Sequence, residues 1–378
     1  MKSVHLKTGS FLLMSAFLLA GCLDGDGNDD GDGSNVGRIT PTGISGLTYK
    51  TASRIGTTGD EGQYRYFPGE QLTLSVGDLE LVGGIPVEPV VTPLEFFTDE
   101  REALKIAGTT DEGLRSHRIT EQELIKTSDP LINMTRFLLA LNWRIRVSNG
   151  QGIDLRERVI AQLNDALLLL SDPIDFNAIR PAFAFEDKKE GRLSPANQLL
   201  AEICFYPPDS ELCEEPPTLE AIKNAPTRPE DPEDRDPDIE YSEDKQAKRD
   251  RILKSIRTIN DIEVETAEVY LTRELDILTT ELGKRYYLKE HVADFPESDT
   301  SIKTLNVRKI AGTPELADIE AISTRSQDVA INSFSWQSAS AEYFLVGDSG
   351  GESEILINFK PDDTYRWVKK SLRVLITP

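Results

Sequence analysis

Changes in the spacing of apolar residues constrain the fold of this chain more than any other feature of its sequence. Over residues 41–82, and again from about residue 302, apolar residues recur at every second position, as in strands with one buried face. Between 92 and 282 they recur at steps of three and four, as on one side of a helix. We therefore predict a multidomain α+β protein with a small N-terminal β module, a central helical region and a C-terminal antiparallel β domain.

Composition divides the chain into successive segments. Residues 23–37 are almost entirely Asp, Gly and Asn, so they lack the apolar area that would offset the entropy lost on ordering. Residues 226–240 space prolines with acids, which predicts an extended and exposed linker. We expect a signal peptide (1–21), a flexible acidic linker (22–40), a small β module (41–91), a helical region with a disulfide loop (92–225), an acidic Pro-rich linker (226–244), a long helical segment (245–300) and an antiparallel β domain (301–378).

An apolar stripe marks the long helical segment. Its members recur at steps of three and four residues: Ile252, Ile256, Ile259, Ala267, Leu271, Leu275, Leu278 and Leu282. The spacing slips around residues 261–264, which predicts a break or kink, and Gly283 is placed to cap the helix end. Such a stripe is more typical of a domain core than of a partner-binding face, and both interpretations stay open at this point.

Local signals also place helix starts in the central region. Asp129-Pro130 matches a start with Pro at the first helical position. Two Ser/Thr/Asp-x-x-Glu patterns, at Thr120 to Glu123 and at Asp154 to Glu157, match capping boxes, in which two side chains satisfy free backbone N–H groups reciprocally. We therefore expect helices to begin near all three sites and to pack as a small bundle.

The N-terminus has the order of a secretory signal. Early lysines precede an apolar run over 11–20, which is too short to span a bilayer as a stable anchor, and small residues follow. Leu19-Ala20-Gly21-Cys22 resembles the lipobox of bacterial lipoproteins. The resemblance implies that Cys22 is lipidated and becomes the mature N-terminus, the alternative being ordinary cleavage beside an incidental Cys. Leu23, rather than Asp, follows the Cys, which in such lipoproteins favours the outer membrane.

Charge and hydropathy narrow the classes of partner. No later stretch comes near the ~18 consecutive apolar residues of a membrane-spanning helix. We expect membrane attachment through the N-terminal lipid alone, with the body in the periplasm or at the cell surface. The net charge of −23 argues against nucleic acid and anionic lipid headgroups, because neither offers positive charge to an acidic surface. It favours divalent cations or basic partners, or reflects only a well-solvated surface.

The other two of the chain's three cysteines predict a disulfide. With Cys22 assigned to lipid, Cys204 and Cys213 remain, and they flank a Pro-rich loop in an exported chain, where an oxidising compartment lets such a pair form. No His or further Cys lies nearby, which argues against a metal site. The spacing is also not that of a redox Cys-x-x-Cys motif. We therefore expect a structural bond.

A weak cation motif lies in the acidic linker. Asp26, Asn28 and Asp30, followed by a Gly, fit the first half of an EF-hand loop. The twelfth position, which needs a bidentate acid, is Gly37, and no helix follows. Loose condensation of divalent cations on this segment is therefore the favoured interpretation over specific calcium binding.

A resemblance accompanies the β module. Gly46-Leu-Thr-Tyr49, then Gly62-Gln-Tyr64-Arg-Tyr66 and Pro68-Gly69-Glu70, resembles a module of uncharacterised bacterial envelope lipoproteins, some of which are labelled organic solvent ABC transporter permeases. A permease needs several membrane spans, so that label does not fit this chain literally. The resemblance covers roughly residues 41–160 and implies a structural rather than a catalytic module.

The chain departs from this family at one turn. Asn142 and Arg144 occupy positions where the lipoproteins that it resembles carry acids. A carboxylate-poor turn holds a cation poorly, which puts a cation site at this turn in doubt.

One short stretch near the C-terminus resembles a protease active-site motif. Residues 347–351 read Gly-Asp-Ser-Gly-Gly, the string around the nucleophile of chymotrypsin-like serine proteases. Such a serine needs a His base, and the two His outside the signal peptide, His117 and His291, lack the Ala-Ala-His context of that family. The helical middle also conflicts with a pair of β barrels. We therefore interpret Ser349 as part of a hairpin tip between two strands.

No motif supplies a cofactor site: no Gly-rich phosphate loop precedes a helix, and neither His-Glu-x-x-His nor Cys-x-x-Cys occurs. Our leading hypothesis is a non-catalytic envelope lipoprotein that binds or scaffolds an envelope protein or polymer. The alternative is an accessory lipoprotein of an envelope lipid or solvent transport system, supported only by the label on similar proteins. A hydrolase is third.

Overall fold

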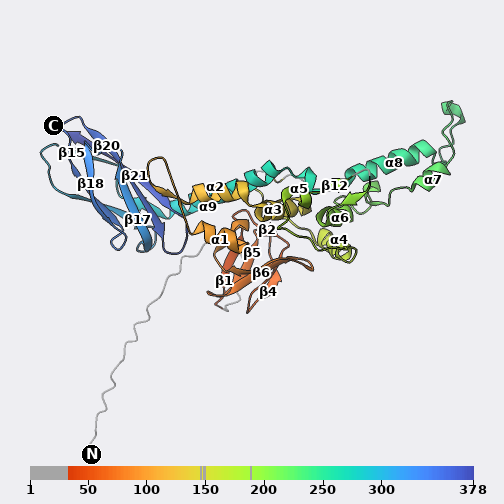
Figure 1. Cartoon of the computed structure of the whole chain (residues 1–378), viewed down its shortest axis with the longest axis horizontal. Helices are drawn as coiled ribbons and strands as arrows, with labels where there is room; N and C mark the ends of the chain where they lie inside the picture. The colour runs from red at the N-terminus through yellow and green to blue at the C-terminus, as the bar shows by residue number, and fades with distance from the viewer. Residues whose placement is uncertain (1–32, 145–146, 148–149, 188–189) are drawn as a thin grey trace, which may run out of the picture. The chain divides into compact units, whose positions relative to one another are not determined.

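The computed structural model describes residues 33–378 except for 145–146, 148–149 and 188–189 (Figure 1). It confirms a mixed α+β fold with a C-terminal antiparallel β region. Residues 33–378 form one compact unit, which contains two separate hydrophobic cores. The first core joins the N-terminal strands to the helices, and the second lies inside the C-terminal sheets.

The N-terminal strands form two small sheets. One has the order β5-β1-β8 and the other β4-β3-β6-β7. Their bounds are β1 (Asn35–Ile39), β3 (Thr48–Lys50), β4 (Ile55–Thr57), β5 (Gln63–Tyr66), β6 (Gln71–Val76), β7 (Leu79–Pro86) and β8 (Val90–Val91). The alternation expected from period two is present in β6, where Leu72, Leu74 and Val76 are buried and the residues between them are not.

The predicted flexible linker, 22–40, is wrong at its C-terminal end. Residues 35–39 are strand β1, which pairs antiparallel with β5 and parallel with β8. Ile39 is fully buried there. The acidic composition of the preceding residues concealed a short strand with one fully buried side chain, and pairing with residues more than twenty positions later fixes this strand in the sheet.

Helices follow the N-terminal strands, with five short strands between them, of which β12 (Glu186–Asp187) and β13 (Arg192–Leu193) pair with each other before α6. Their bounds are α1 (Thr98–Leu104), β9 (Gly108–Thr109), β10 (Arg115–Ser116), α2 (His117–Thr127), α3 (Asp129–Leu141), β11 (Ile153–Asp154), α4 (Glu157–Leu167), α5 (Arg180–Phe183) and α6 (Pro195–Ala201). Every residue of α3 from Leu131 to Leu141 is buried, so α3 is the centre of the first core. The predicted start at Asp129 is confirmed, with Ser128 accepting a hydrogen bond from the Leu131 N–H.

Neither predicted capping box caps a helix. Helix α2 begins at His117, so the first box lies inside the helix. Asp154 belongs to β11, which pairs with β2 (Ile44–Ser45), and Arg156 occupies the cap of α4. In both cases pairing or packing elsewhere in the chain outweighed the local signal.

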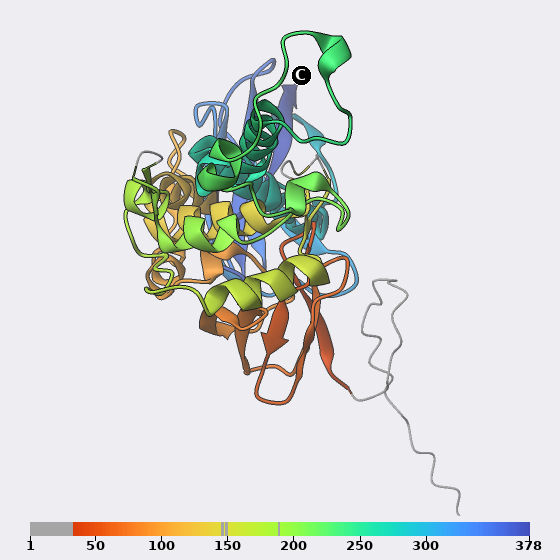
Figure 2. The same ribbon diagram turned by 90° about the vertical axis from the view of Figure 1, so that its right-hand side faces the viewer.

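The Pro-rich linker, 226–244, does not run extended between two domains. The Ser242 N–H donates to the Pro226 carbonyl at 2.9 Å, and Arg228 pairs with Asp244, so the two ends of the segment meet. The chain therefore leaves α7 (Leu219–Lys223) and returns into α8 (Ser242–Ser255), which packs against it. Figures 1 and 2 show this loop in green. The spacing of the prolines predicts that the segment is locally stiff, but the contacts between its two ends determine that it forms a closed loop.

The long helical segment contains the predicted break. After α8, a short 3-10 turn covers Ile259–Asp261, and α9 (Val264–Lys284) then runs for 21 residues. The predicted end at residue 300 is wrong, because β14 (Tyr286–Leu288) and β15 (Val292–Pro296) follow and enter the C-terminal sheets. Gly283 lies inside α9, and Arg285 is the cap residue.

The C-terminal β region contains two four-stranded sheets. Their orders are β14-β16-β19-β18 and β15-β21-β20-β17, with β15 parallel to β21 and the other pairs antiparallel. The remaining bounds are β16 (Lys303–Lys309), β17 (Leu316–Ser323), β18 (Val329–Ser335), β19 (Ser340–Leu345), β20 (Glu352–Pro361) and β21 (Val368–Thr377). Alternate residues of β20, including Ile355, Ile357 and Phe359, are fully buried in the second core.

Helix α9 provides a matched test of this packing. Leu271 is buried in the first core, whereas Val269, two residues earlier, is 62% exposed. We expect Leu271→Ala to lower the free energy of unfolding by about 2–5 kcal/mol, because it leaves a cavity. Val269→Ala should change it by less than about 0.5 kcal/mol. Urea unfolding measures both, and equal losses would contradict the orientation of α9.

Candidate functional site

The candidate site lies on helix α9. The apolar stripe of this helix is core, as the sequence favoured: Ala267, Tyr270, Leu271 and Leu275 enter the first core and Leu282 the second. One helix therefore contributes to both cores. Polar contacts then attach α9 and the turn that precedes it to neighbouring elements at four places.

The first contact joins α9 to the N-terminal strands. Glu274 is fully buried, and its carboxylate accepts hydrogen bonds of 2.9 Å from the Thr42 N–H and from the Thr42 hydroxyl. Arg273 donates to the same carboxylate at 2.7 Å. A buried carboxylate without such donors would be costly, so this contact fixes the Thr42 turn against the middle of α9.

The second contact lies where α9 begins. The buried Arg136 of α3 donates to the Ile262 carbonyl at 2.7 Å and to the Ile259 carbonyl at 2.9 Å. Burial lowers the pKa of this guanidinium, and the neighbouring Arg180 lowers it further. The contact gives the carbonyls of the turn that precedes α9 hydrogen-bond partners, and it thereby ties that turn to α3.

The third contact is His117, the first residue of α2. Its Nε2 lies 3.2 Å from the Thr279 hydroxyl on α9, and its Nδ1 accepts the Trp367 N–H at 2.9 Å. Because Nδ1 accepts a hydrogen bond from the Trp367 N–H, Nδ1 carries no proton and the ring is neutral. Burial, together with Arg366 and Arg118, lowers the pKa of His117 to about 3.

A buried acid, Glu121, lies beside His117, where α2 meets the loop between β20 and β21. Glu121 of α2 accepts a hydrogen bond from the Tyr365 hydroxyl at 2.8 Å and lies 3.4 Å from the Arg366 Nε. Arg366 also donates to Glu95 at 3.1 Å. Burial raises the pKa of Glu121 to about 7 even though Arg366 opposes the shift. The loop between β20 and β21 is thus inserted between α2 and residues near α1.

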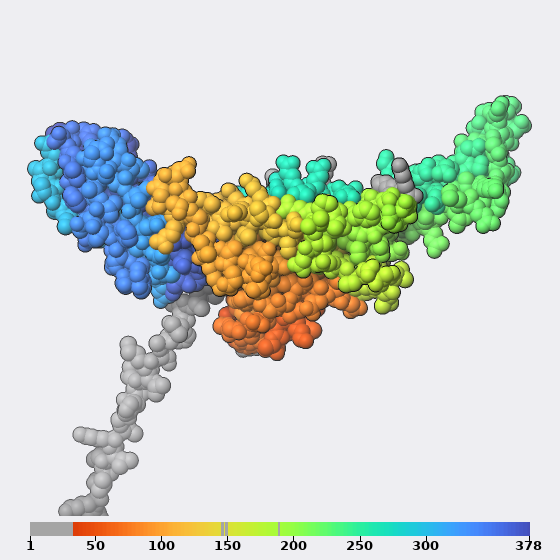
Figure 3. All heavy atoms as spheres, viewed as in Figure 1, coloured from red at the N-terminus to blue at the C-terminus, as the bar shows by residue number. Residues whose placement is uncertain are grey.

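The fourth contact anchors the C-terminal end of α9 to the second core. The Lys370 ammonium on β21 donates to the Gly283 carbonyl at 2.8 Å, where a cation also complements the negative end of the helix dipole. Beside it, Arg115 of β10 pairs with Asp318 and Glu320 on β17. Figure 3 shows the surface around β10 (orange) in contact with that of the C-terminal sheets (blue).

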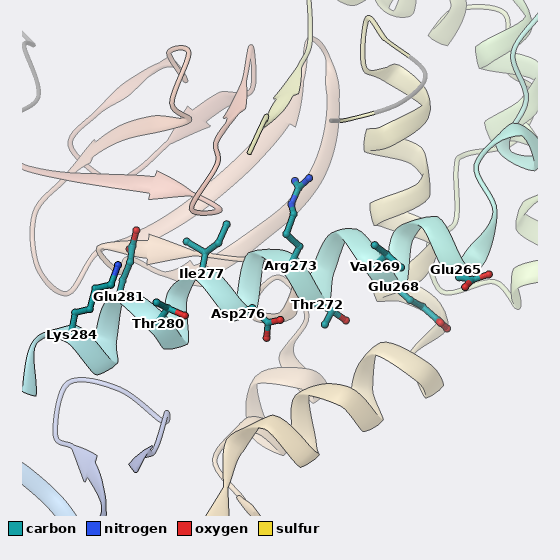
Figure 4. A pocket seen from close by; sticks show the side chains of 10 residues that line it. All are labelled: Glu265, Glu268, Val269, Thr272, Arg273, Asp276, Ile277, Thr280, Glu281 and Lys284. Atoms are coloured by element: carbon teal, nitrogen blue, oxygen red, sulfur yellow. The ribbon is translucent and has the colours of Figure 1, made fainter. Parts of the chain in front are cut away.

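The opposite face of α9 carries the candidate site. A hollow of about 760 Å³ lies along it, and all the side chains that line the hollow come from α9 (Figure 4). They form two rows at four-residue spacing. One row is Glu265, Val269, Arg273, Ile277 and Glu281, and the other is Glu268, Thr272, Asp276, Thr280 and Lys284. The groove between two such rows is the feature into which helices pack side chains of another helix.

The groove carries both paired and unpaired charges. Asp276 pairs with Arg118, and Arg273 with Glu274. Within the part of the chain that the structure describes, no ion pair involves Glu265, Glu268 or Glu281. Glu265 lies in the first turn, where the helix dipole favours an acid, but Glu281 lies near the C-terminal end, where it does not. This face was not predicted from the sequence, although its rows at four-residue spacing are visible there.

The predicted lipidation, cation and disulfide residues fall into two groups. Cys22 and the cation candidates Asp26, Asn28 and Asp30 lie outside the described residues. Cys204 and Cys213 form a disulfide. Across the described ranges, no group of three His, Cys, Asp or Glu side chains is placed to hold a metal ion, and no helix there is long and apolar enough to cross a membrane.

The position of Ser349 corrects the predicted hairpin. Strands β19 and β20 belong to different sheets, so residues 346–351 connect the two sheets instead of closing a hairpin. The tight turn itself is present: Gly350 has φ +89°, and the Gly351 N–H donates to the Asp348 carbonyl at 3.0 Å. Matching turn residues predict the turn, but they do not say which strands pair.

Neither described His reaches Ser349. Its backbone N–H donates to Glu297, and the neighbouring Gly350 donates to the Ile376 carbonyl. His291 is six residues before Glu297 along β15, roughly 20 Å of extended chain. His117 contacts Trp367, at the other end of β21 from Ile376 and roughly 30 Å away. The geometry offers Ser349 no imidazole base.

Comparison with known proteins gives no relative: no family model, no curated protein and no solved structure matches this chain.

The raised pKa of Glu121 can be tested through the pH dependence of stability. Because its pKa is higher in the folded state than the usual value near 4.3, the folded chain binds this proton more tightly, and the free energy of unfolding falls between about pH 4.5 and pH 7. Glu121→Gln removes that titration. As the pH rises through this window, the free energy of unfolding of the variant should increase by up to roughly 3 kcal/mol relative to that of the parent chain. Urea unfolding of both chains at pH 4.5 and pH 8 measures this difference.

The His117 titration is common to both chains and cancels in the difference. A stability difference that does not change with pH would contradict a buried Glu121 with a raised pKa.

Ser349 gives a test of catalysis. A fluorophosphonate probe reacts with activated serines, which need a base, and the geometry offers Ser349 none. We expect no labelling of the chain and the same result for Ser349→Ala. Labelling that disappears in Ser349→Ala, detected by in-gel fluorescence, would contradict this conclusion.

Proposed function

We propose that this chain is an envelope lipoprotein, attached to the outer membrane through a lipid on Cys22, whose body binds or scaffolds a partner without catalysis. The observation that carries the proposal is the arrangement of α9. Polar contacts, buried or partly buried, attach α9 and the turn that precedes it to the Thr42 turn, to α2, to α3 and to β21. The outer side of α9 is left as an open groove. A rigid exposed surface is what a binding protein needs, since less entropy is lost when the partner docks.

The transport alternative receives less support from the same surface. An accessory lipoprotein that handles lipids or solvents would need an apolar chamber. The hollow along α9 is open and lined largely by polar side chains, with Val269 and Ile277 as its apolar members. This lining suits a protein surface better than an acyl chain.

Lipid attachment is tested first. Cys22→Ala removes the only thiol available for lipidation at the lipobox, so the variant should leave the outer-membrane fraction and appear in the soluble fraction. Fractionation followed by immunoblotting measures the distribution. Unchanged membrane fractionation of Cys22→Ala would contradict the lipoprotein assignment.

The binding role is tested in the same cells. We expect a chemical crosslinker applied to cells that carry the lipidated chain to join it to another envelope protein, identified by mass spectrometry. Recovery of transporter subunits would favour the transport alternative. Recovery of nothing would count against a binding role.

A further inference from the structure

We propose that the groove on α9 is a docking surface for a basic amphipathic α-helix of another envelope protein. This inference rests on the proposed binding function and specifies its partner. Three observations carry it: the geometry of the groove, its apolar members and its unpaired charges.

The geometry selects a helix as the occupant. The ten lining residues are two complete rows at four-residue spacing on a single helix. Rows of this kind are the ridges that interlock when two helices pack, with their axes 8–10 Å apart. The rows extend from Glu265 to Lys284, about 30 Å, which matches a partner helix of five to six turns.

The apolar members set the spacing that the partner must match. Val269 is 62% exposed, and Ile277, partly exposed, lies two turns further along the same row. Leu139 and Tyr270 line a second hollow, of about 310 Å³, which shares Val269 with the first. Val269 thus stands between two hollows. A helix with apolar residues two turns apart would cover both Val269 and Ile277.

The charges select a basic helix and argue against a second copy of this chain. Glu265, Glu268 and Glu281 have no ion pair within the described ranges, and they lie at both ends of the groove. Lys284 lines the same end as Glu281 and is also without an ion pair within those ranges, so the unpaired charge of the lining is net negative. Lys or Arg residues flanking the apolar stripe of the partner would meet them. Two copies of α9 would instead add like charges to two chains that each carry a net charge of −23.

Positional crosslinking in the native cells tests the proposal on the full chain. A photoreactive amino acid is introduced at Val269 or at Ile277, with a control at Tyr287, which is 41% exposed on β14. We expect both α9 positions, but not Tyr287, to give the same adduct. The crosslinked peptide, sequenced by mass spectrometry, should be a helix-forming segment with a net positive charge and apolar residues two turns apart.

Charge reversal provides the matched control. Glu268→Lys with Glu281→Lys should lower the adduct yield at Val269 at least tenfold. Glu80→Lys with Glu354→Lys, which reverses the same number of exposed acids elsewhere, should leave the yield unchanged. Circular dichroism and thermal unfolding of each variant confirm that the chain is folded.

Several results would overturn the proposal. These are an adduct between two copies of this chain, an acidic or non-helical crosslinked peptide, no adduct at either α9 position, or a yield that charge reversal leaves unchanged. Failure here is distinguishable from failure of the proposed function. If the chemical crosslinker recovers an envelope protein but the α9 positions give no adduct, the binding role stands and this docking surface does not.

Discussion

The two hydrophobic cores share one helix, and the rest of the structure depends on this constraint. The inner side of α9 supplies Leu271 and Leu275 to the first core and Leu282 to the second. Burial of these side chains contributes roughly 1.5–3 kcal/mol each, so neither core can form fully unless α9 is helical over its whole length. The N-terminal strands, the helices and the C-terminal sheets are thereby linked through a single continuous element.

Buried polar groups specify how the parts attach to α9. Apolar contacts tolerate some sliding, whereas Glu274 against Thr42 and Arg136 against two carbonyls each permit only a narrow geometry. The same holds for His117, whose two ring nitrogens are engaged by different parts of the chain. Each of these groups would be costly to bury alone, so each requires its distant partner. The cores supply most of the stability, and these contacts supply the orientation.

The groove is a consequence of the same arrangement. The core contacts of α9 occupy its inner side, whereas its outer rows line an open hollow and are tied to α2 by the ion pair between Asp276 and Arg118. A helix that is core on one side and grooved on the other can carry a binding surface without losing stability, because the two faces use different residues. This separation underlies the proposed role of the chain as a rigid binding protein.

The sequence by itself determined the kinds of elements and their order. Periods of two and of three to four residues identified the strands and the core stripe of α9, slippage at 261–264 located the break, and the cysteine count identified the disulfide. These signals are local, since they depend on which face of an element is buried or on pairs close in the chain.

Only the tertiary structure decided which elements meet. It placed β1 in a sheet, closed the 226–244 segment on itself, assigned the strands flanking Ser349 to different sheets and left one face of α9 free. Each of these outcomes depends on pairing or packing between residues distant in the chain, and the free energy of such contacts is not encoded in any local spacing. For that reason the sequence could show that α9 has two different faces, but only the fold could show which one remains exposed.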